Sequence, residues 1–354
     1  MSIRLFVATC LAVSAGAALC GTAVAADAES TTISGRMFVD LTNIDLTNDG
    51  VDSTANGTGI DVKRFYLGVT HNFDEIWSVN VTSDFNYVSN DGETQIYIKK
   101  AYLQAKVSDA LIGRLGSADL PWVPFVENIY GYRFLEPVLV DRLKFGTSAD
   151  WGLHGTGQMA DGAFNYAVAV INGNGYKNPT RSNAVDVEGR VGYSPIKGLV
   201  FAAGVYSGKL GKDVEGIQTF HTANRFDALA AYSANGLRVG AEYFHAKDWG
   251  QVLTAASDKA DGFSVWASYD FSPQWGVFAR GDHAKTSKDL NPDLKDKYFN
   301  AGFVTHPRKN IDVALAYKHE KVDGGGTVTG SNGTIGGVSE GKYREVGVWA
   351  QVNF

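Results

Sequence analysis

The sequence predicts an all-β fold, a closed transmembrane antiparallel β-barrel of about 16 strands. Apolar and polar residues alternate with a period of two along most of the chain, which is typical of strands with two unlike environments. The connections between these segments are alternately short and long. After the first 26 residues no apolar run is long enough to cross a membrane as a helix, and a closed barrel is the other way to satisfy the backbone in lipid.

Residues 1–26 are predicted to be a cleavable secretory signal peptide, which leaves 27–354 as the barrel domain. Arg4 is followed by an apolar run and then by small residues, the order typical of such signals. Cleavage is expected after Ala25 or Ala26. A membrane-spanning helix is disfavoured because no stop-transfer charges follow the run.

Composition excludes several classes of function. Cys10 and Cys20 both lie in the predicted signal peptide, so the mature chain is expected to hold no disulfide, no thiolate metal site and no cysteine nucleophile. Lipid modification of Cys20 is an alternative, but Leu19 before it fits poorly. The formal net charge of −6 becomes −7 when Arg4 is removed, and this argues against nucleic acid as a partner. We expect no cofactor and no metal.

The strands are predicted from the alternation. The clearest segment, 77–87, puts Trp77 and Val79 on one face and Ser78 and Asn80 on the other. The predicted strands lie near 33–43, 61–72, 77–87, 94–107, 111–116, 148–159, 163–172, 185–193, 199–206, 224–233, 237–249, 261–271, 275–285, 296–306, 311–322 and 342–354.

The lengths of the connections predict which rim of the barrel is periplasmic and which is extracellular. Short turns are expected at 72–76, 108–110, 160–162, 194–198, 234–236, 272–274 and 307–310, and long loops at 44–60, 173–184, 207–223, 250–260, 286–295 and 323–341. Short turns on one rim and long loops on the other are typical of outer-membrane barrels, with the short side periplasmic. An even strand count brings both termini to that rim.

The last segment, 342–354, alternates to its end and stops on Phe354. It resembles the closing strand of a bacterial outer-membrane barrel. That resemblance implies that Phe354 belongs to the signal read by the barrel-assembly machinery. The alternative is a surface strand of a soluble β-protein.

Residues 117–147 interrupt the pattern. This stretch is apolar without alternation and contains three prolines, so it suits neither an exposed loop nor a strand. We expect it to fold into the barrel lumen as an inward third extracellular loop, with its charged residues facing and narrowing the water path. These residues are Glu127, Arg133, Glu136, Asp141, Arg142 and Lys144. The alternative is a plug or a surface cap.

The polar faces of the strands supply the predicted lumen wall. Its main cations are Arg36, Arg64, Lys100, Arg114, Arg190, Arg238 and Arg280, beside a similar number of acids. A mixed field can orient dipolar solutes, whereas a ladder of one sign is expected for strong ion selection. The alternative is that many of these residues pair across strands and brace the wall.

The order of motifs from 95 to 175 resembles the phosphate-selective porin O/P family. The residues that carry it are KAYL at 100–103, IGRLG at 112–116 before a proline-rich loop, DWGL at 150–153 and FNYAVAVING at 164–173. The resemblance implies a trimer of sixteen-stranded channels whose third extracellular loop folds inward, with basic lumen residues guiding an anion. Arg133, Arg142 and Lys144 are available for that role, interleaved with acids.

These observations together predict an outer-membrane porin of a Gram-negative bacterium, for passive diffusion of small hydrophilic solutes, with anions such as phosphate among them. Its expected partners are outer-membrane lipid and lipopolysaccharide, the barrel-assembly machinery, periplasmic chaperones and two further copies of the chain. A sugar porin or a non-specific diffusion porin is the alternative.

Two other functions are less well supported by the sequence than a porin. A lipase or protease barrel is disfavoured because the seven histidines are scattered, with no HExxH or GxSxG motif. The glycine-rich stretch 324–337 is expected to be a flexible extracellular loop. The alternative for this stretch is a role as an adhesin or receptor.

Overall fold

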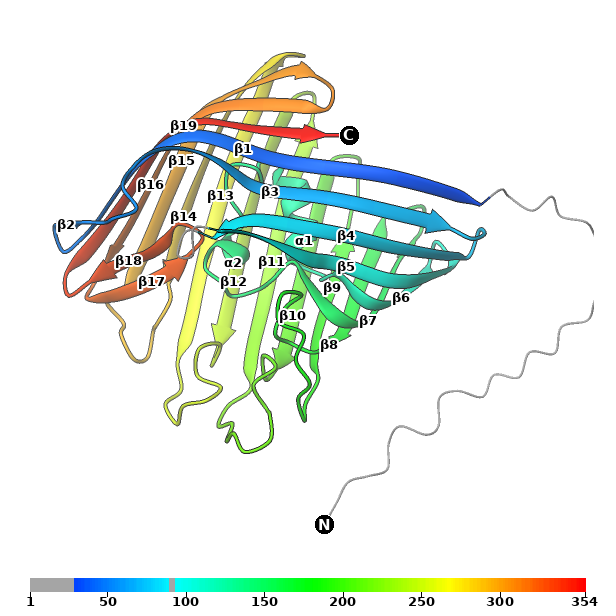
Figure 1. Cartoon of the computed structure of the whole chain (residues 1–354), viewed down its shortest axis with the longest axis horizontal. Helices are drawn as coiled ribbons and strands as arrows, with labels where there is room; N and C mark the ends of the chain where they lie inside the picture. Colours follow the sequence, from blue (N-terminus) through cyan, green and yellow to red (C-terminus); the bar gives the residue numbers. More distant parts are fainter. Residues whose placement is uncertain (1–28, 89–92) are drawn as a thin grey trace, which may run out of the picture.

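The computed structural model describes residues 29–88 and 93–354, so the predicted signal peptide lies outside the described residues. Within these ranges, sixteen long antiparallel strands close into one barrel (Figure 1). They are β1 (Ser30–Asn48), β3 (Gly57–Asn72), β4 (Trp77–Val88), β5 (Glu93–Ser108), β6 (Leu111–Asp119), β7 (Ala149–Met159), β8 (Phe164–Ile171), β9 (Asp186–Tyr193), β10 (Leu199–Gly208), β11 (Ala223–Ala234), β12 (Leu237–Lys247), β13 (Lys259–Ser272), β14 (Trp275–Lys285), β15 (Lys295–Arg308), β16 (Ile311–Asp323) and β19 (Glu340–Asn353). The predicted fold class is confirmed.

The first and last strands close the barrel. β1 pairs antiparallel with β19 from Arg36 opposite Asn353 onwards. Beyond this ladder, Gly35 N–H donates to the carbonyl of Phe354 at 2.8 Å, and Phe354 N–H donates back to Gly35 at 3.0 Å. The terminal residue therefore completes the ladder, and no strand edge is left open at the seam.

The predicted long loop at 44–60 is wrong. β1 continues to Asn48, and the chain turns at Asp49 and Gly50, both with positive φ, into the short strand β2 (Val51–Asp52). An Asp-Gly pair suits a tight turn because both residues tolerate positive φ. The polar residues before the turn are strand because they pair with β19, as far as Asn48 opposite Gly341.

The glycine-rich stretch is a hairpin of two short strands, β17 (Gly326–Gly330) and β18 (Gly333–Gly337), not the expected flexible loop. Asp49 helps to fix it, because the Asp49 carboxylate accepts hydrogen bonds from the backbone N–H groups of Val338 and Ser339, both at 2.7 Å.

The chain between β6 and β7 lies inside the barrel (Figure 1). It contains the helices α1 (Val123–Tyr130) and α2 (Leu139–Arg142). In the described part of the chain, no helix is long and apolar enough to cross a membrane. We call residues 120–148 the lumen loop. Its buried apolar side chains pack on inward residues of β12, β13 and β14, namely Phe244, Trp266 and Phe278.

Candidate functional site: the cavities beside the lumen loop

Among the cavities formed by the described residues, two inside the barrel share lining residues. The larger has a volume of about 600 Å³ and is lined by the lumen loop, by residues of the long connections 172–178 and 210–212, and by inward wall residues. The smaller, about 480 Å³, is lined near the short-turn rim by Arg36, Asn353 and Phe354. Tyr66 and Lys99 line both cavities, so this pair marks where they meet.

A β-bulge sets the position of Lys99. In the pairing of β4 with β5, Thr82 is opposite Lys100 and Ser83 is opposite Ile98, so Lys99 is the extra residue. Strict alternation would turn Lys99 and Lys100 to opposite faces, whereas a bulge redirects one side chain. Both lysines therefore line the smaller cavity. The sequence prediction included Lys100 but missed Lys99.

The Lys99 ammonium lies over aromatic rings. Its Nζ is 4.5 Å from the ring centroid of Tyr66 and 5.8 Å from that of Tyr176. Among the described residues, no carboxylate forms an ion pair with it. A cation on an aromatic face keeps its charge available to a solute, because the ring attracts the cation without neutralising it.

Four of the six predicted loop charges line the cavities. Arg133, Asp141 and Lys144 line the larger cavity, and Glu127 lines the smaller one. Arg133 forms an ion pair with Glu127, and its Nη2 is 3.7 Å from Asp141 Oδ2. Burial raises the pKa of Glu127, although Arg133 acts in the opposite direction.

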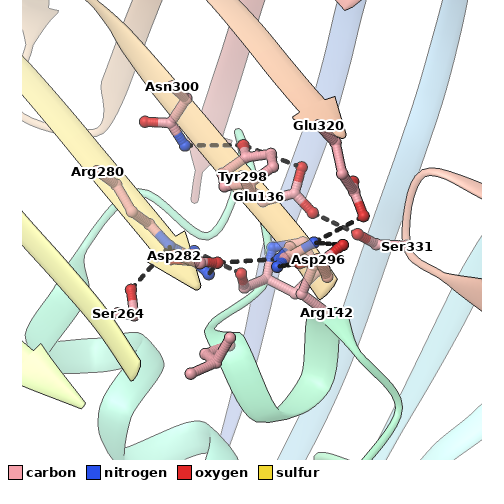
Figure 2. A network of polar contacts seen from close by, with 12 residues as sticks. Glu136, Arg142, Ser264, Arg280, Asp282, Asp296, Tyr298, Asn300, Glu320 and Ser331 are labelled. Atoms are coloured by element: carbon pink, nitrogen blue, oxygen red, sulfur yellow. Dashed lines mark hydrogen bonds and ion pairs between the residues drawn. The ribbon is translucent and has the colours of Figure 1, made fainter. Parts of the chain in front are cut away.

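The other two, Glu136 and Arg142, do not face the water path, which corrects their expected position. The Arg142 side chain is fully buried; its Nε lies 2.9 Å from Asp282, its Nη2 2.5 Å from Asp296 and its Nη1 2.8 Å from Glu320 (Figure 2). Glu136 is equally buried and pairs with Lys318 at 3.3 Å. A buried arginine requires such partners, since desolvation of an unpaired charge is costly.

The hairpin β17–β18 meets the same network. Ser331, at its tip, donates its backbone N–H to the carbonyl of Arg142 at 2.9 Å and its hydroxyl to Glu136. Next to it, Asn332 donates to Glu320 at 2.7 Å. The hairpin therefore holds the lumen loop from the side of the long connections.

Wall arginines hold the loop along its length. Arg190 donates to the carbonyl of Pro121 at 2.9 Å, Arg238 to Tyr130 at 3.2 Å, Arg280 to Pro137 at 2.6 Å and Arg225 to Phe145 at 2.5 Å. All four face inward, and each satisfies a carbonyl that the irregular loop leaves unpaired. Arg190, Arg238 and Arg280 belong to the predicted lumen wall, and in the structure their guanidinium groups hold the loop.

The remaining predicted wall cations lie on β1, β3, β5 and β6, away from the wall arginines that hold the loop. Arg64 lines the larger cavity and pairs with Asp84 at 2.8 Å. Arg36 and Lys100 line the smaller cavity. Arg114 donates to Gln104 at 2.8 Å, with its guanidinium over the Tyr102 ring.

The fold is similar to those of solved outer-membrane porins. An anion-selective porin from Comamonas acidovorans superposes with a TM-score of 0.69 at 14% identity, covering 92% of this chain and 100% of that one. OmpT, an outer membrane protein of Vibrio cholerae in its trimer form, gives 0.61 at 14% identity, with 93% and 100% covered. DcaP, an outer membrane channel of Acinetobacter baumannii, gives 0.62 at 12% identity, with 92% and 97% covered. No protein-family model and no curated protein sequence matches the chain.

Proposed function

We propose that this chain is an outer-membrane porin whose channel favours small anions. The lining of the larger cavity carries the proposal: among the described residues it includes seven Lys or Arg and three Asp or Glu. The cations are Arg64, Lys99, Arg133, Lys144, Lys177, Lys212 and Arg225, and the acids are Asp141, Asp150 and Glu188. Arg64, Arg133 and Arg225 also pair with Asp84, Glu127 and Asp227, and the seven cations exceed these six acids by one. Excess positive charge beside a path lowers the energy of a passing anion and raises that of a cation.

The smaller cavity is balanced in charge. Among its described lining residues, Arg36, Lys99 and Lys100 stand against Asp119, Glu127 and the carboxylate of the last residue, Phe354. The anion-selective porin from Comamonas acidovorans supports the proposal by its similar fold. We further propose a homotrimer, which the trimer form of OmpT supports. Phosphate is one anion to test, because the resemblance of 95–175 to the phosphate-selective porins favours it.

Reversal potentials in a planar bilayer test the proposal. The purified protein is expected to conduct, and a KCl gradient is expected to give a potential of the sign set by chloride. Repeating the measurement with phosphate compares the two anions. A conducting channel with a cation-favouring potential would exclude the anion preference and leave a sugar or non-specific porin. Hydrolysis of lipid or peptide by a protein that does not conduct would favour an enzyme.

A further inference from the structure

Tyrosine rings and lysine ammonium groups alternate in and beside the larger cavity. The Lys177 ammonium is 4.1 Å from the centroid of the Tyr97 ring and 6.0 Å from that of the Tyr176 ring. The Tyr176 ring centroid is also 5.8 Å from the Lys99 ammonium, which lies 4.5 Å from the centroid of the Tyr66 ring. Each contact therefore leads to the next, and we call these five residues the tyrosine–lysine row.

Three separate segments build the row, and buried groups fix its centre. Tyr97 lies on β5 opposite Asp84 of β4, and the Asp84 side chain is fully buried. The Tyr176 hydroxyl, from the long connection after β8, donates to Asp84 at 2.5 Å. The carbonyl of Tyr176 accepts a hydrogen bond from the indole N–H of Trp151 at 3.0 Å. The Tyr176 ring is thus held in place from both its hydroxyl and its backbone.

The end of the row at Tyr66 and Lys99 is accessible from both cavities. Both residues are half-buried, and both line the larger and the smaller cavity. A solute that moves from one cavity to the other therefore passes this pair. The smaller cavity repeats the arrangement, because Tyr102 lines it and the Arg114 guanidinium lies 5.1 Å from the centroid of the Tyr102 ring.

Attraction of a simple anion requires the lysines alone, whereas the rings add a second kind of contact. An ammonium group is attracted to the face of any aromatic ring, and two aromatic rings attract each other in offset or edge-to-face arrangements. A solute that carries both a carboxylate and an aromatic ring can use both contacts. Its carboxylate pairs with a lysine while its ring packs against a tyrosine or accepts the ammonium on its own face.

We infer that the channel favours small aromatic carboxylates, of the class of benzoate, over non-aromatic carboxylates of the same size. The carboxylate passes from Lys177 to Lys99, and the ring passes from Tyr176 to Tyr66. Several weak contacts in series allow a solute to leave as well as to enter, which conduction requires. The inference rests on the proposed function as an anion-favouring porin and specifies the class of its solute.

Two carboxylates test the inference on the unmodified channel. Potassium benzoate and potassium cyclohexanecarboxylate carry the same charge and have nearly the same size, but the saturated ring offers no aromatic face to an ammonium group. Reversal potentials in a planar bilayer with one salt on each side give the ratio of the two permeabilities. Benzoate is expected to be about fivefold more permeant. Equal permeability of the two in an anion-favouring channel would overturn the inference without any variant.

Variants of Tyr66 separate contact with the solute from support of Lys99. Tyr66→Leu should bring the permeability ratio of the two carboxylates close to one and leave the ratio of chloride to potassium unchanged, because no charge is removed. Tyr66→Phe keeps the ring and should keep the preference. Tyr317→Leu is the matched control, because Tyr317 is 41% exposed on the outer face of β16. An equal fall for both carboxylates in Tyr66→Leu would show that the ring only positions Lys99, and would overturn the inference.

The potential in a KCl gradient distinguishes failure of the inference from failure of the proposed function. An anion-favouring potential in KCl without a benzoate preference would reject only the aromatic carboxylates as the favoured solutes. A cation-favouring potential in KCl would reject the proposed anion preference, and the inference with it. An anion-favouring potential together with a benzoate preference that Tyr66→Leu abolishes and Tyr66→Phe retains is the result expected from the tyrosine–lysine row.

Discussion

Arg142 and Asp282 form an ion pair between the lumen loop and strand β14, with Arg142 Nε 2.9 Å from Asp282 Oδ2 and both side chains inaccessible to solvent. The pair joins residues 140 positions apart in the chain. It attaches the loop to β14, whereas Tyr66 of β3 and Lys99 of β5 line the two cavities described above. Arg142 thus affects the cavities through the position of the loop, whereas Arg133 lines the larger cavity itself.

Replacing Arg142 by Met should loosen the lumen loop. Removing one member of a buried ion network leaves uncompensated charges and costs about 3–5 kcal/mol. We expect faster amide hydrogen exchange over residues 120–148 and noisier single-channel currents. Arg133→Ala should instead shift the reversal potential away from anions and leave exchange nearly unchanged. Identical behaviour of the two variants would contradict this division of roles.

Replacing Lys99 by Gln should reduce the anion preference. A unit charge several ångströms away in largely aqueous surroundings contributes about 0.5–1 kcal/mol. The permeability ratio of chloride to potassium should therefore fall roughly two- to fivefold. Lys106→Gln is the control, because Lys106 pairs with Asp109 at the rim. If both variants changed the ratio equally, the junction of the cavities would not control selectivity.

The anion preference should fall as pH rises from 7 to 9. Burial and the nearby Arg64 lower the pKa of Lys177 to about 8. Below that pH the Lys177 ammonium is charged and attracts anions, and above it the charge is lost. Reversal potentials across this range measure the change. The Lys177→Gln channel should be almost independent of pH there, and an unaltered slope would show that another group titrates.

Replacing Gly35 by Leu should impair barrel closure. A Cβ at Gly35 would lie 2.1 Å from the Phe354 ring, so the ring must leave its place at the seam. In electrophoresis without boiling, we expect a smaller fraction of the protein to migrate in the fast band of the folded, heat-resistant barrel. Gly113→Leu is the control, since nothing lies within 4 Å of a Cβ there.

Deleting Phe354 tests its proposed role as an assembly signal. The deletion removes the ring and its two backbone hydrogen bonds with Gly35. We expect less protein in isolated outer membranes, and an unchanged reversal potential for the channels that do assemble. Normal insertion of the shortened chain would contradict the assembly role.

The alternation of polar and apolar residues was enough to predict the strands and the faces of them that point inward. The break in that alternation predicted the segment that forms the lumen loop. Arg190, Arg238 and Arg280 do face inward, as a period of two requires. The sequence could not say whether they face water or the loop. That depends on which side the loop packs against, which is set by contacts distant in sequence, such as those of Phe244 and Trp266.

The same limit applies to the site. A bulge is a property of two paired strands, so Lys99 entered the lumen through a register shift against β4 that no pattern within β5 reveals. In the sequence, Arg142 resembles an exposed loop cation. In the structure its three carboxylate partners come from β14, β15 and β16, which are distant in sequence. The sequence by itself determined the barrel and the direction of each regular strand residue, because both follow from local periodicity. Only the tertiary structure decided which charges meet the solute, because burial and pairing are set between segments.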